Sequence, residues 1–207
     1  MTADMDPVNS VIEKITSCEE KFIPLMCRLE VIYKKMDEQY NETANYYGFC
    51  CEGCEENCCF TRFYHHTFAE YLYLQKGFET LEPGNRAEIQ EKALSVCRKT
   101  AELDKAGLPV RLLCPLNYEG MCILYEYRPM ICRLHGLPHE IIMPPGGGEK
   151  TGPGCGEFNA RCSDKEYFKF DRTLFYTEMA GLEKDFKEAF GISGRIKMTV
   201  AHMLATL

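Results

Sequence analysis

The longest regular hydrophobic pattern lies near the start of the chain. Between Val8 and about Thr43, apolar residues recur at alternating spacings of three and four: Val11, Ile15, Cys18, Phe22, Leu25, Leu29, Ile32 and Met36. This spacing lines one face of a helix and predicts an N-terminal helical segment over residues 1–44. Pro24 falls inside the pattern, where its missing amide and its ring predict a kink or a split.

Further helices are expected from apolar spacing combined with start and stop signals. They cover about Arg62–Phe78, Asn85–Lys105, a stretch from the cap candidate Ser163 to Phe190, and Ser193–Thr206. Alternating strand patterns are scarce, although Leu137–Met143 is expected to pair briefly. The proline- and glycine-rich stretch Pro144–Gly154 predicts an exposed loop.

These patterns predict a mainly α fold in which helices frame cysteine-rich metal-binding loops, with little or no β structure. We expect one domain over residues 1–207. It is divided into the N-terminal helical segment 1–44, a cysteine-cluster metal-binding region over 45–162 and C-terminal helices over 163–207.

Composition and charge narrow the class of protein. The 207 residues are 45% hydrophobic and 27% charged, which is ordinary for a soluble globular protein. The net charge of −7 argues against nucleic acid as a partner, because phosphates require a basic surface. No apolar run is long enough to span a membrane, and the acidic N-terminus lacks a signal sequence, so we expect a cytoplasmic protein with no membrane partner.

The chain contains 13 cysteines, an unusual number. Disulfides would need an oxidising compartment, and an odd count leaves one thiol unpaired, so metal ligation is favoured. Cys18, Cys27 and Cys97 lie on expected helices and are interpreted as small buried apolar residues. The other ten lie in loops or at helix ends: Cys50, Cys51, Cys54, Cys58, Cys59, Cys114, Cys122, Cys132, Cys155 and Cys162.

The first cluster is the stretch FCCEGCEENCCF, Phe49 to Phe60. Cys51 and Cys54 have the two-residue separation that lets both sulfurs face one metal. Cys58 and Cys59 are adjacent, so their side chains diverge. Either they serve different centres or only one of them is a ligand.

The second cluster runs from Cys114 to Cys132. Pro129 suits the first position of a short helix, which would place Cys132 in the first turn, where free amides favour a thiolate. Arg128 and Arg133 flank this site. Their guanidinium groups can offset the negative charge of several thiolates, although pairing with Glu119 or Glu126 is the simpler alternative.

Together, CEGCEENCC and CILYEYRPMICRLHG resemble the YkgJ-type cysteine-cluster family, described as a zinc- or iron-chelating domain with a CxxCxxCC signature. The matching residues of the second motif are Cys122, Ile123, Tyr125, Arg128, Pro129, Cys132 and Arg133. The first motif departs from the family, since three residues rather than two separate Cys54 from Cys58. Flagellin lysine methylases have a similar signature, associated there with an iron–sulfur cluster. The resemblance covers about Cys50 to Gly136 and implies a cofactor class, not an activity.

Further candidate ligands lie outside the two clusters. Cys155 lies in the glycine-rich GPGCGE turn, which could deliver a sulfur to a buried centre. His135 and His139 lie near the second cluster and are interpreted as surface histidines rather than ligands. His65 and His66 are interpreted as residues of the helix that follows the first cluster.

The sequence therefore predicts a cysteine-ligated centre with a structural or redox role, either an iron–sulfur cluster, with [4Fe–4S] favoured, or zinc. The expected ligands are Cys51, Cys54, Cys58, Cys59, Cys114, Cys122, Cys132 and Cys155, with Arg128 and Arg133 beside them. Of these, Cys51, Cys54, Cys122 and Cys132 are expected to approach one metal region. The alternatives are a cluster-dependent group-transfer enzyme, such as a protein lysine methyltransferase, and metal storage or delivery. A protein partner or substrate is expected but not identified.

Overall fold

The computed structural model describes residues 11–12, 14–50, 58–143 and 147–207, and the side chain of Cys58 is not among what it describes. Helices account for 59% of the structure and strands for 8%, which confirms the predicted mainly helical class. The helices are α2 (Glu19–Tyr47), α3 (Phe68–Glu79), α4 (Pro83–Lys105), α5 (Met130–Leu134), α6 (Gly156–Cys162), α7 (Thr173–Phe190) and α8 (Val200–Ala205), with 3-10 turns η1 (Cys58–Phe60) and η2 (Tyr125–Tyr127). The strands are β1 (Asn117–Tyr118), β2 (Met121–Cys122), β3 (His139–Ile142) and β4 (Glu149–Gly152).

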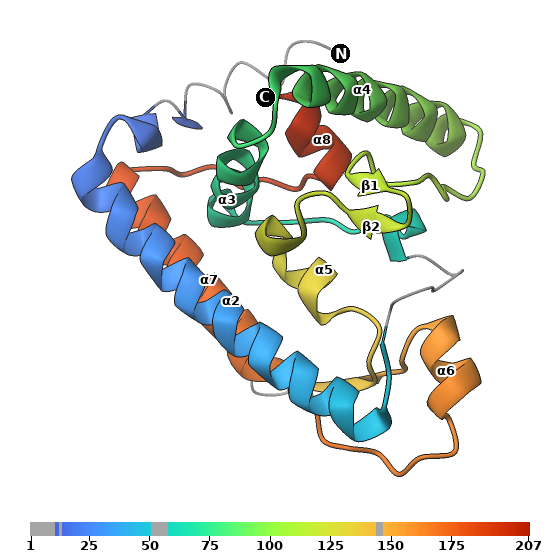
Figure 1. The fold of residues 1–207 in the computed structure, drawn as a ribbon. Coiled ribbons are helices and arrows are strands. Elements are labelled where there is room, and N and C mark those ends of the chain that lie inside the picture. The colour runs from blue at the N-terminus through green and yellow to red at the C-terminus, as the bar shows by residue number, and fades with distance from the viewer. Residues whose placement is uncertain (1–10, 13, 51–57, 144–146) are drawn as a thin grey trace.

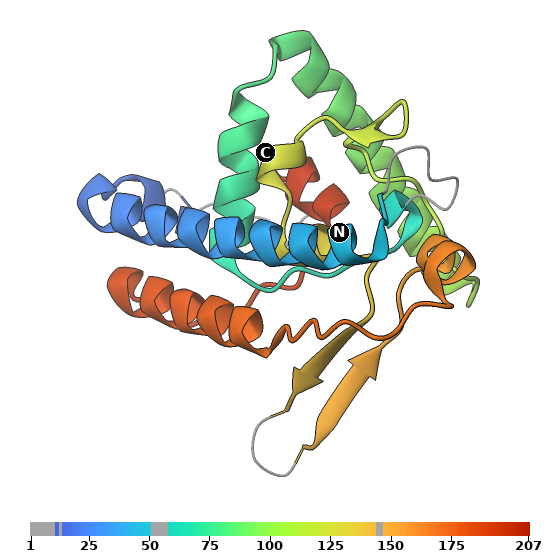
Figure 2. The same cartoon turned by 60° about the horizontal axis from the view of Figure 1, so that its bottom comes forward.

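Helices α2 and α7 lie side by side along one edge of the molecule (Figures 1 and 2). They are antiparallel, since Lys21 near the start of α2 donates to the carbonyl of Ala189 near the end of α7, at 3.1 Å. Further along, Lys35 pairs with Glu178 at 3.0 Å. Along their shared face the two helices bury apolar side chains: Leu29, Ile32, Met36, Met179, Leu182 and Phe186. The apolar stripe read from the sequence is therefore the face that α2 buries.

The N-terminal helix is divided, but not at Pro24. The break falls at Ser17 and Cys18, and α2 then runs without interruption from Glu19 to Tyr47 with Pro24 inside it (Figure 1). The predicted split at Pro24 is wrong. Pro24 removes the amide that would bond to the carbonyl of Glu20, and because Glu20 is exposed, water can satisfy that carbonyl.

Helix α3 begins six residues later than predicted, at Phe68 instead of Arg62. Thr67 caps it, since its hydroxyl accepts a hydrogen bond from the amide of Glu70 at 3.1 Å. The preceding residues are extended, and His65 exchanges two backbone hydrogen bonds with Met198, at 2.8 and 3.0 Å. The interpretation of His65 and His66 as helix residues is therefore wrong.

The later helices differ in how well the sequence placed them. Helix α4 ends at Lys105 as expected and begins at Pro83, two residues before the predicted cap. Ser163 ends α6 instead of starting a helix, and α7 begins only at Thr173. The last helix is shorter than predicted because the chain stays extended until Thr199, which caps α8. Helix α8 packs against α4 (Figure 1).

Two antiparallel hairpins make up the strands. In the first, Asn117 pairs with Cys122. In the second, β3 pairs with β4 with His139 opposite Gly152, and this hairpin extends away from the helices (Figure 2). Brief pairing over 137–143 is thus confirmed. Part of the predicted loop 144–154 is strand β4, and residues 144–146 of it lie outside the described residues.

Candidate metal centre

Cys59, Cys114, Cys122 and Cys132 come together from separate segments; we call them the cysteine quartet. Cys59 lies in η1, and its carbonyl accepts a hydrogen bond from the amide of Cys114 at 2.9 Å. The β1–β2 hairpin brings Cys122 back toward Cys114, since Asn117 pairs with Cys122 and donates to the carbonyl of Cys114 at 3.0 Å. Cys132 comes from α5. Backbone hydrogen bonds thus bring three of the four positions together.

The four sulfurs lie close enough to influence one another. Burial, opposed in part by the Leu116 amide, raises the pKa of Cys114 to about 12, and the charges of Cys59 and Cys122 add to this. Burial also raises the pKa of Cys122 to about 11, again with a contribution from Cys59. For Cys132, burial followed by the charges of Cys114 and Cys122 raises the pKa well above its usual value. Grouped thiols like these ionise readily only beside a cation.

Two backbone amides oppose the effect of burial in the quartet. The amide of Leu116 lowers the pKa of Cys114, and the amide of Leu124 lowers the pKa of Cys122. In both cases the amide is two residues beyond the cysteine. Leu116 and Leu124 are each 3% exposed, so buried side chains hold these two amides in place. The repeated arrangement favours the thiolate form at both positions.

The chemistry of the quartet suits a soft metal, since thiolate sulfur is the preferred ligand of zinc and of iron–sulfur clusters. Within the described residues, no group of three or more Cys, His, Asp or Glu side chains is already arranged to hold an ion. Cys51 and Cys54 lie outside those residues, as does the Cys58 side chain. Their predicted approach to Cys122 and Cys132 therefore stays a prediction.

Arg128 is the cation that faces the quartet. Its positive charge lowers the pKa of both Cys122 and Cys132, against the larger effect of burial. The guanidinium lies 3.3 Å from the centre of the Tyr125 ring, and its Nε donates to the Tyr125 carbonyl at 2.8 Å. The side chain is thus held on its own turn, where its charge can offset that of thiolates.

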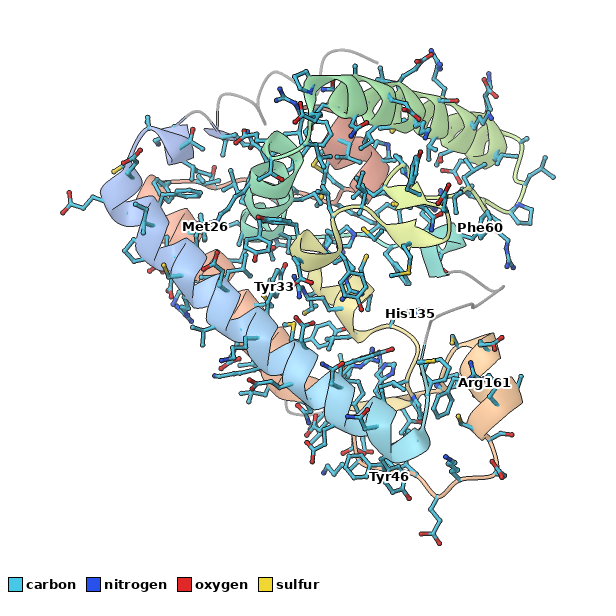
Figure 3. The ribbon with its side chains drawn as sticks, in the orientation of Figure 1. Met26, Tyr33, Tyr46, Phe60, His135 and Arg161 are labelled. Atoms are coloured by element: carbon cyan, nitrogen blue, oxygen red, sulfur yellow. The ribbon has the colours of Figure 1, made fainter. Side chains whose placement is uncertain are left out.

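The side chain of Arg133 points away from the quartet and holds the backbone of the preceding turn in place. It is 4% exposed and pairs with Asp37 of α2 at 2.5 Å, so its carboxylate partner is neither Glu119 nor Glu126. Its Nε donates to the carbonyl of Arg128 at 2.8 Å, and Nη2 donates to the carbonyl of Glu126. The guanidinium also lies over Tyr33, which Figure 3 labels on α2. Arg133 therefore fixes the turn that carries Arg128 to the long N-terminal helix.

A buried carboxylate fixes the start of α5. Glu70 of α3 accepts a hydrogen bond from the amide of Met130 at 3.0 Å, and its other oxygen lies 2.8 Å from the hydroxyl of Thr67. His65 lies 3.7 Å from the same carboxylate. Pro129 is the cap of α5 instead of its first residue, and Cys132 lies in the first turn as predicted. The Thr-x-x-Glu pattern at 67–70 is a local signal for the start of α3, and it was missed in the sequence.

Cys155 and Cys162 have local roles at α6. The sulfur of Cys155 caps this helix by accepting from the amide of Phe158 at 3.4 Å, and its own amide donates to the carbonyl of Gly136 at 2.9 Å. Cys162 is buried, with its sulfur 3.6 Å from the carbonyl of Tyr47. Cys50 is exposed. The contacts of Cys155 account for its position without a metal, although they leave its sulfur available as a donor.

The remaining candidates separate into three environments. His135, labelled in Figure 3, packs its ring on Phe63 with 5.0 Å between centres. Burial and the charge of Arg172 lower the pKa of both His135 and His139, which favours neutral imidazoles. Cys18 and Cys97 are half-buried on their helices. Cys27 is exposed, so its interpretation as a buried residue is wrong.

No known protein family, curated protein or solved structure matches this chain in the comparisons made with each. The likeness to YkgJ-type proteins therefore rests on the cysteine motifs alone. In the part of the chain that the structure describes, no helix is both long and apolar enough to cross a membrane.

Proposed function

We propose that this protein holds a cysteine-ligated metal centre at the cysteine quartet, with an iron–sulfur cluster favoured and zinc as the alternative. The observation that carries the proposal is the convergence of Cys59, Cys114, Cys122 and Cys132, combined with backbone amides that favour the thiolate form of two of them. Such a centre would tie η1, the β1–β2 hairpin and α5 together. When bound, it would supply either a structural link or a one-electron redox group.

The surroundings of the quartet support an anionic centre. Four thiolates around zinc or a [4Fe–4S] cluster leave a net negative charge, which needs nearby donors and cations. The amides of Leu116 and Leu124 and the guanidinium of Arg128 are such groups. Arg133 and Glu70 act one step further out, because they position the backbone that carries Arg128 and Cys132.

The number of cysteines leaves room for more than one centre. The quartet supplies four sulfurs, and Cys51, Cys54, Cys58 and Cys155 are proposed as further ligands. Four sulfurs suffice for one zinc ion or one four-iron cluster. The additional four would allow a second centre, or an exchange of ligands within the first. Group transfer at the centre stays a prediction from the resemblance.

The test is to purify the full chain without oxygen and to measure iron, zinc and acid-labile sulfide per chain, together with an absorption spectrum. An iron–sulfur centre predicts iron and sulfide in similar amounts and broad visible absorption. Zinc predicts zinc without sulfide or colour. Substoichiometric amounts of both metals in freshly prepared protein would contradict the proposal. Oxygen must be excluded because oxidised thiols lose metal.

A further inference from the structure

The outer face of α2 exposes a line of apolar side chains. Ile23 is 53% exposed and Val31 is 55% exposed, and Cys27 between them is exposed as well. Because the three are spaced four residues apart, they follow one line along the helix for about 12 Å. Leu29 and Met36, which are fully buried, lie about half a turn around the helix from this line. The line therefore faces away from the molecule, and Figures 1 and 2 show α2 at its rim.

Charged residues continue this line at both ends. Glu20 lies three residues before Ile23, Lys34 lies three residues after Val31, and both are exposed. The arrangement is symmetric about Cys27, since the two apolar residues lie four positions from it and the two charges lie seven positions from it. Positions at equal distance from the centre match in kind, apolar with apolar and acidic with basic. We call these five residues, Glu20, Ile23, Cys27, Val31 and Lys34, the outer stripe.

This symmetry makes the outer stripe complementary to a second copy of itself. When two identical helices pack antiparallel about a two-fold axis at Cys27, each position meets the position at equal distance on the other side of the axis. Ile23 of one copy then meets Val31 of the other, and Glu20 meets Lys34, so that each pair forms twice. Parallel packing would instead bring Glu20 to Glu20 and Lys34 to Lys34, which repel each other.

The charges around the outer stripe leave its own charges available. Arg28 and Glu30, on either side of the stripe, are paired with carboxylate and ammonium groups of α7 and α3. Lys34 lies 3.8 Å from Glu38, but the two side chains are 79% and 65% exposed. Such an exposed pair contributes little, so Lys34 can turn to another carboxylate at small cost.

We propose that the outer stripe is the interface of a weak antiparallel homodimer of this chain. Packed helices have axes about 8–10 Å apart, and their Cα atoms lie about 2.3 Å from each axis. The smallest side chain of the stripe, Cys27, is at the crossing point, where the two backbones come closest. One helix pair buries less than the roughly 1,200–2,000 Å² of a stable complex, so we expect a micromolar or weaker dissociation constant. The interface uses none of the proposed metal ligands.

The dimer can be tested by sedimentation equilibrium of the full chain, purified without oxygen and kept reduced so that disulfides cannot join two copies. We expect the average mass to rise with concentration, over about 1–300 µM, from the 23.8 kDa of one chain toward twice that value. A mass of one chain at every concentration would overturn the proposal.

Charge reversal tests which face forms the dimer. Glu20→Lys and Lys34→Glu should each raise the dissociation constant about tenfold, because each turns two attractive pairs into two repulsive ones. Mixed in equal amounts, the two variants should associate again, since one then carries only basic and the other only acidic ends of the stripe.

Glu91→Lys is the matched control, because it makes the same change of charge at an exposed position of α4 and should dimerise like the unmodified chain. Thermal unfolding verifies that each variant folds. A dimer that neither stripe variant weakens, or a mixture of the two that associates no better than each alone, would overturn the proposal. An equal loss in Glu91→Lys would also overturn it, since net charge alone would then explain the effect.

Discussion

The α2–α7 pair and the cysteine segment, residues 108–135, are built in opposite ways. In the helix pair, the large apolar side chains are inside, with Leu29, Met36, Leu182 and Phe186 fully buried. In the cysteine segment many of them are outside: Leu108 is 55% exposed, Leu113 39%, Tyr118 58%, Met121 56%, Ile123 37% and Tyr125 47%. What the segment turns inward are the sulfurs of Cys114, Cys122 and Cys132.

This difference indicates what orders each region. Apolar burial accounts for the packing of α2 on α7, since each buried Leu or Phe contributes about 1.5–3 kcal/mol. The cysteine segment has only a few buried apolar side chains, Leu116, Leu124 and Leu134 among them. It is also held by the hydrogen bond from Arg133 to the carbonyl of Arg128 and by the bond that Glu70 accepts at the start of α5. A metal at the quartet would supply the remaining order.

The largest effect is expected from Cys114→Ser and Cys132→Ser. Each should remove most of the bound metal and lower the free energy of unfolding by several kcal/mol, because metal binding on the order of 10 kcal/mol is coupled to folding. Metal analysis and thermal unfolding under nitrogen measure both effects. Cys27→Ser is the control, since this exposed cysteine should change stability by less than about 0.5 kcal/mol. Full metal content in both quartet variants would refute the ligand assignment.

Truncating apolar side chains should affect the two regions differently. Leu29→Ala should cost about 2–5 kcal/mol, because it leaves a cavity in the face between α2 and α7. Met121→Ala, in the cysteine segment, should cost less than about 0.5 kcal/mol because the side chain is exposed. Chemical denaturation measures both. A cost for Met121→Ala similar to that for Leu29→Ala would show that the cysteine segment also depends on apolar burial.

The ion pair and hydrogen bonds of Arg133, which join the cysteine segment to α2, should make an intermediate contribution to stability. Arg133→Met leaves the partly exposed Asp37 without its partner and frees the carbonyls of Glu126 and Arg128. We expect a loss of about 2–3 kcal/mol, less than for a fully buried pair. Arg128→Gln is the control, since it leaves the contacts of Arg133 in place. It should leave the stability of metal-free protein nearly unchanged and weaken metal binding. Equal destabilisation of metal-free protein by both variants would argue against separate roles.

Among the substitutions expected to destabilise the fold, the one at Glu70 should have the smallest effect, and this effect depends on pH. Burial acts to raise the pKa of Glu70, but His65, whose ring nitrogen lies 3.7 Å from the carboxylate, together with the hydrogen bonds from Thr67 and Met130, lowers it below its usual value. The ionised carboxylate therefore stabilises the fold above the unfolded pKa of about 4.3, and this contribution is lost as pH falls through the folded pKa.

Glu70→Gln should cost about 1–2 kcal/mol at pH 7, and its difference from the unmodified chain should shrink below about pH 4. Denaturation midpoints at pH 7 and pH 3.5 measure this. Glu102→Gln, an exposed change on α4, is the control. A difference for Glu70→Gln that stays the same at both pH values would mean that the carboxylate charge is unimportant.

How well the sequence predicted each helix depended on where its boundary signal lay. The stripe of α2 and the stop of α4 were read correctly because regular spacing and a following Gly107 are local signals. The start of α3 was misplaced because His65 is held extended by Met198, far away in the chain. The start of α7 was misplaced for a similar reason, since Glu140 exchanges backbone bonds with Phe170 and Arg172.

The sequence indicated which residue types would make up the candidate site, but not which residues they would contact. Cysteine spacing predicted Cys114, Cys122 and Cys132 as ligands, which stays a prediction, and the short β1–β2 hairpin brings the first two of them toward each other. Sequence could not reveal that Arg133 turns away to Asp37, because that ion pair joins residues 96 positions apart. The cap that Glu70 provides for α5 spans 60 positions and was missed for the same reason.

X-ray absorption at the iron and zinc edges, on the full chain purified without oxygen, tests the metal assignment most directly. We expect a first shell of sulfur only, at about 2.3 Å for zinc. We also expect an iron–iron contribution if the centre is a cluster. The same spectrum from Cys114→Ser should lose sulfur ligands, while that from Cys27→Ser should be unchanged. A first shell dominated by nitrogen or oxygen, or a spectrum insensitive to Cys114, would contradict the assignment of the quartet as a metal centre.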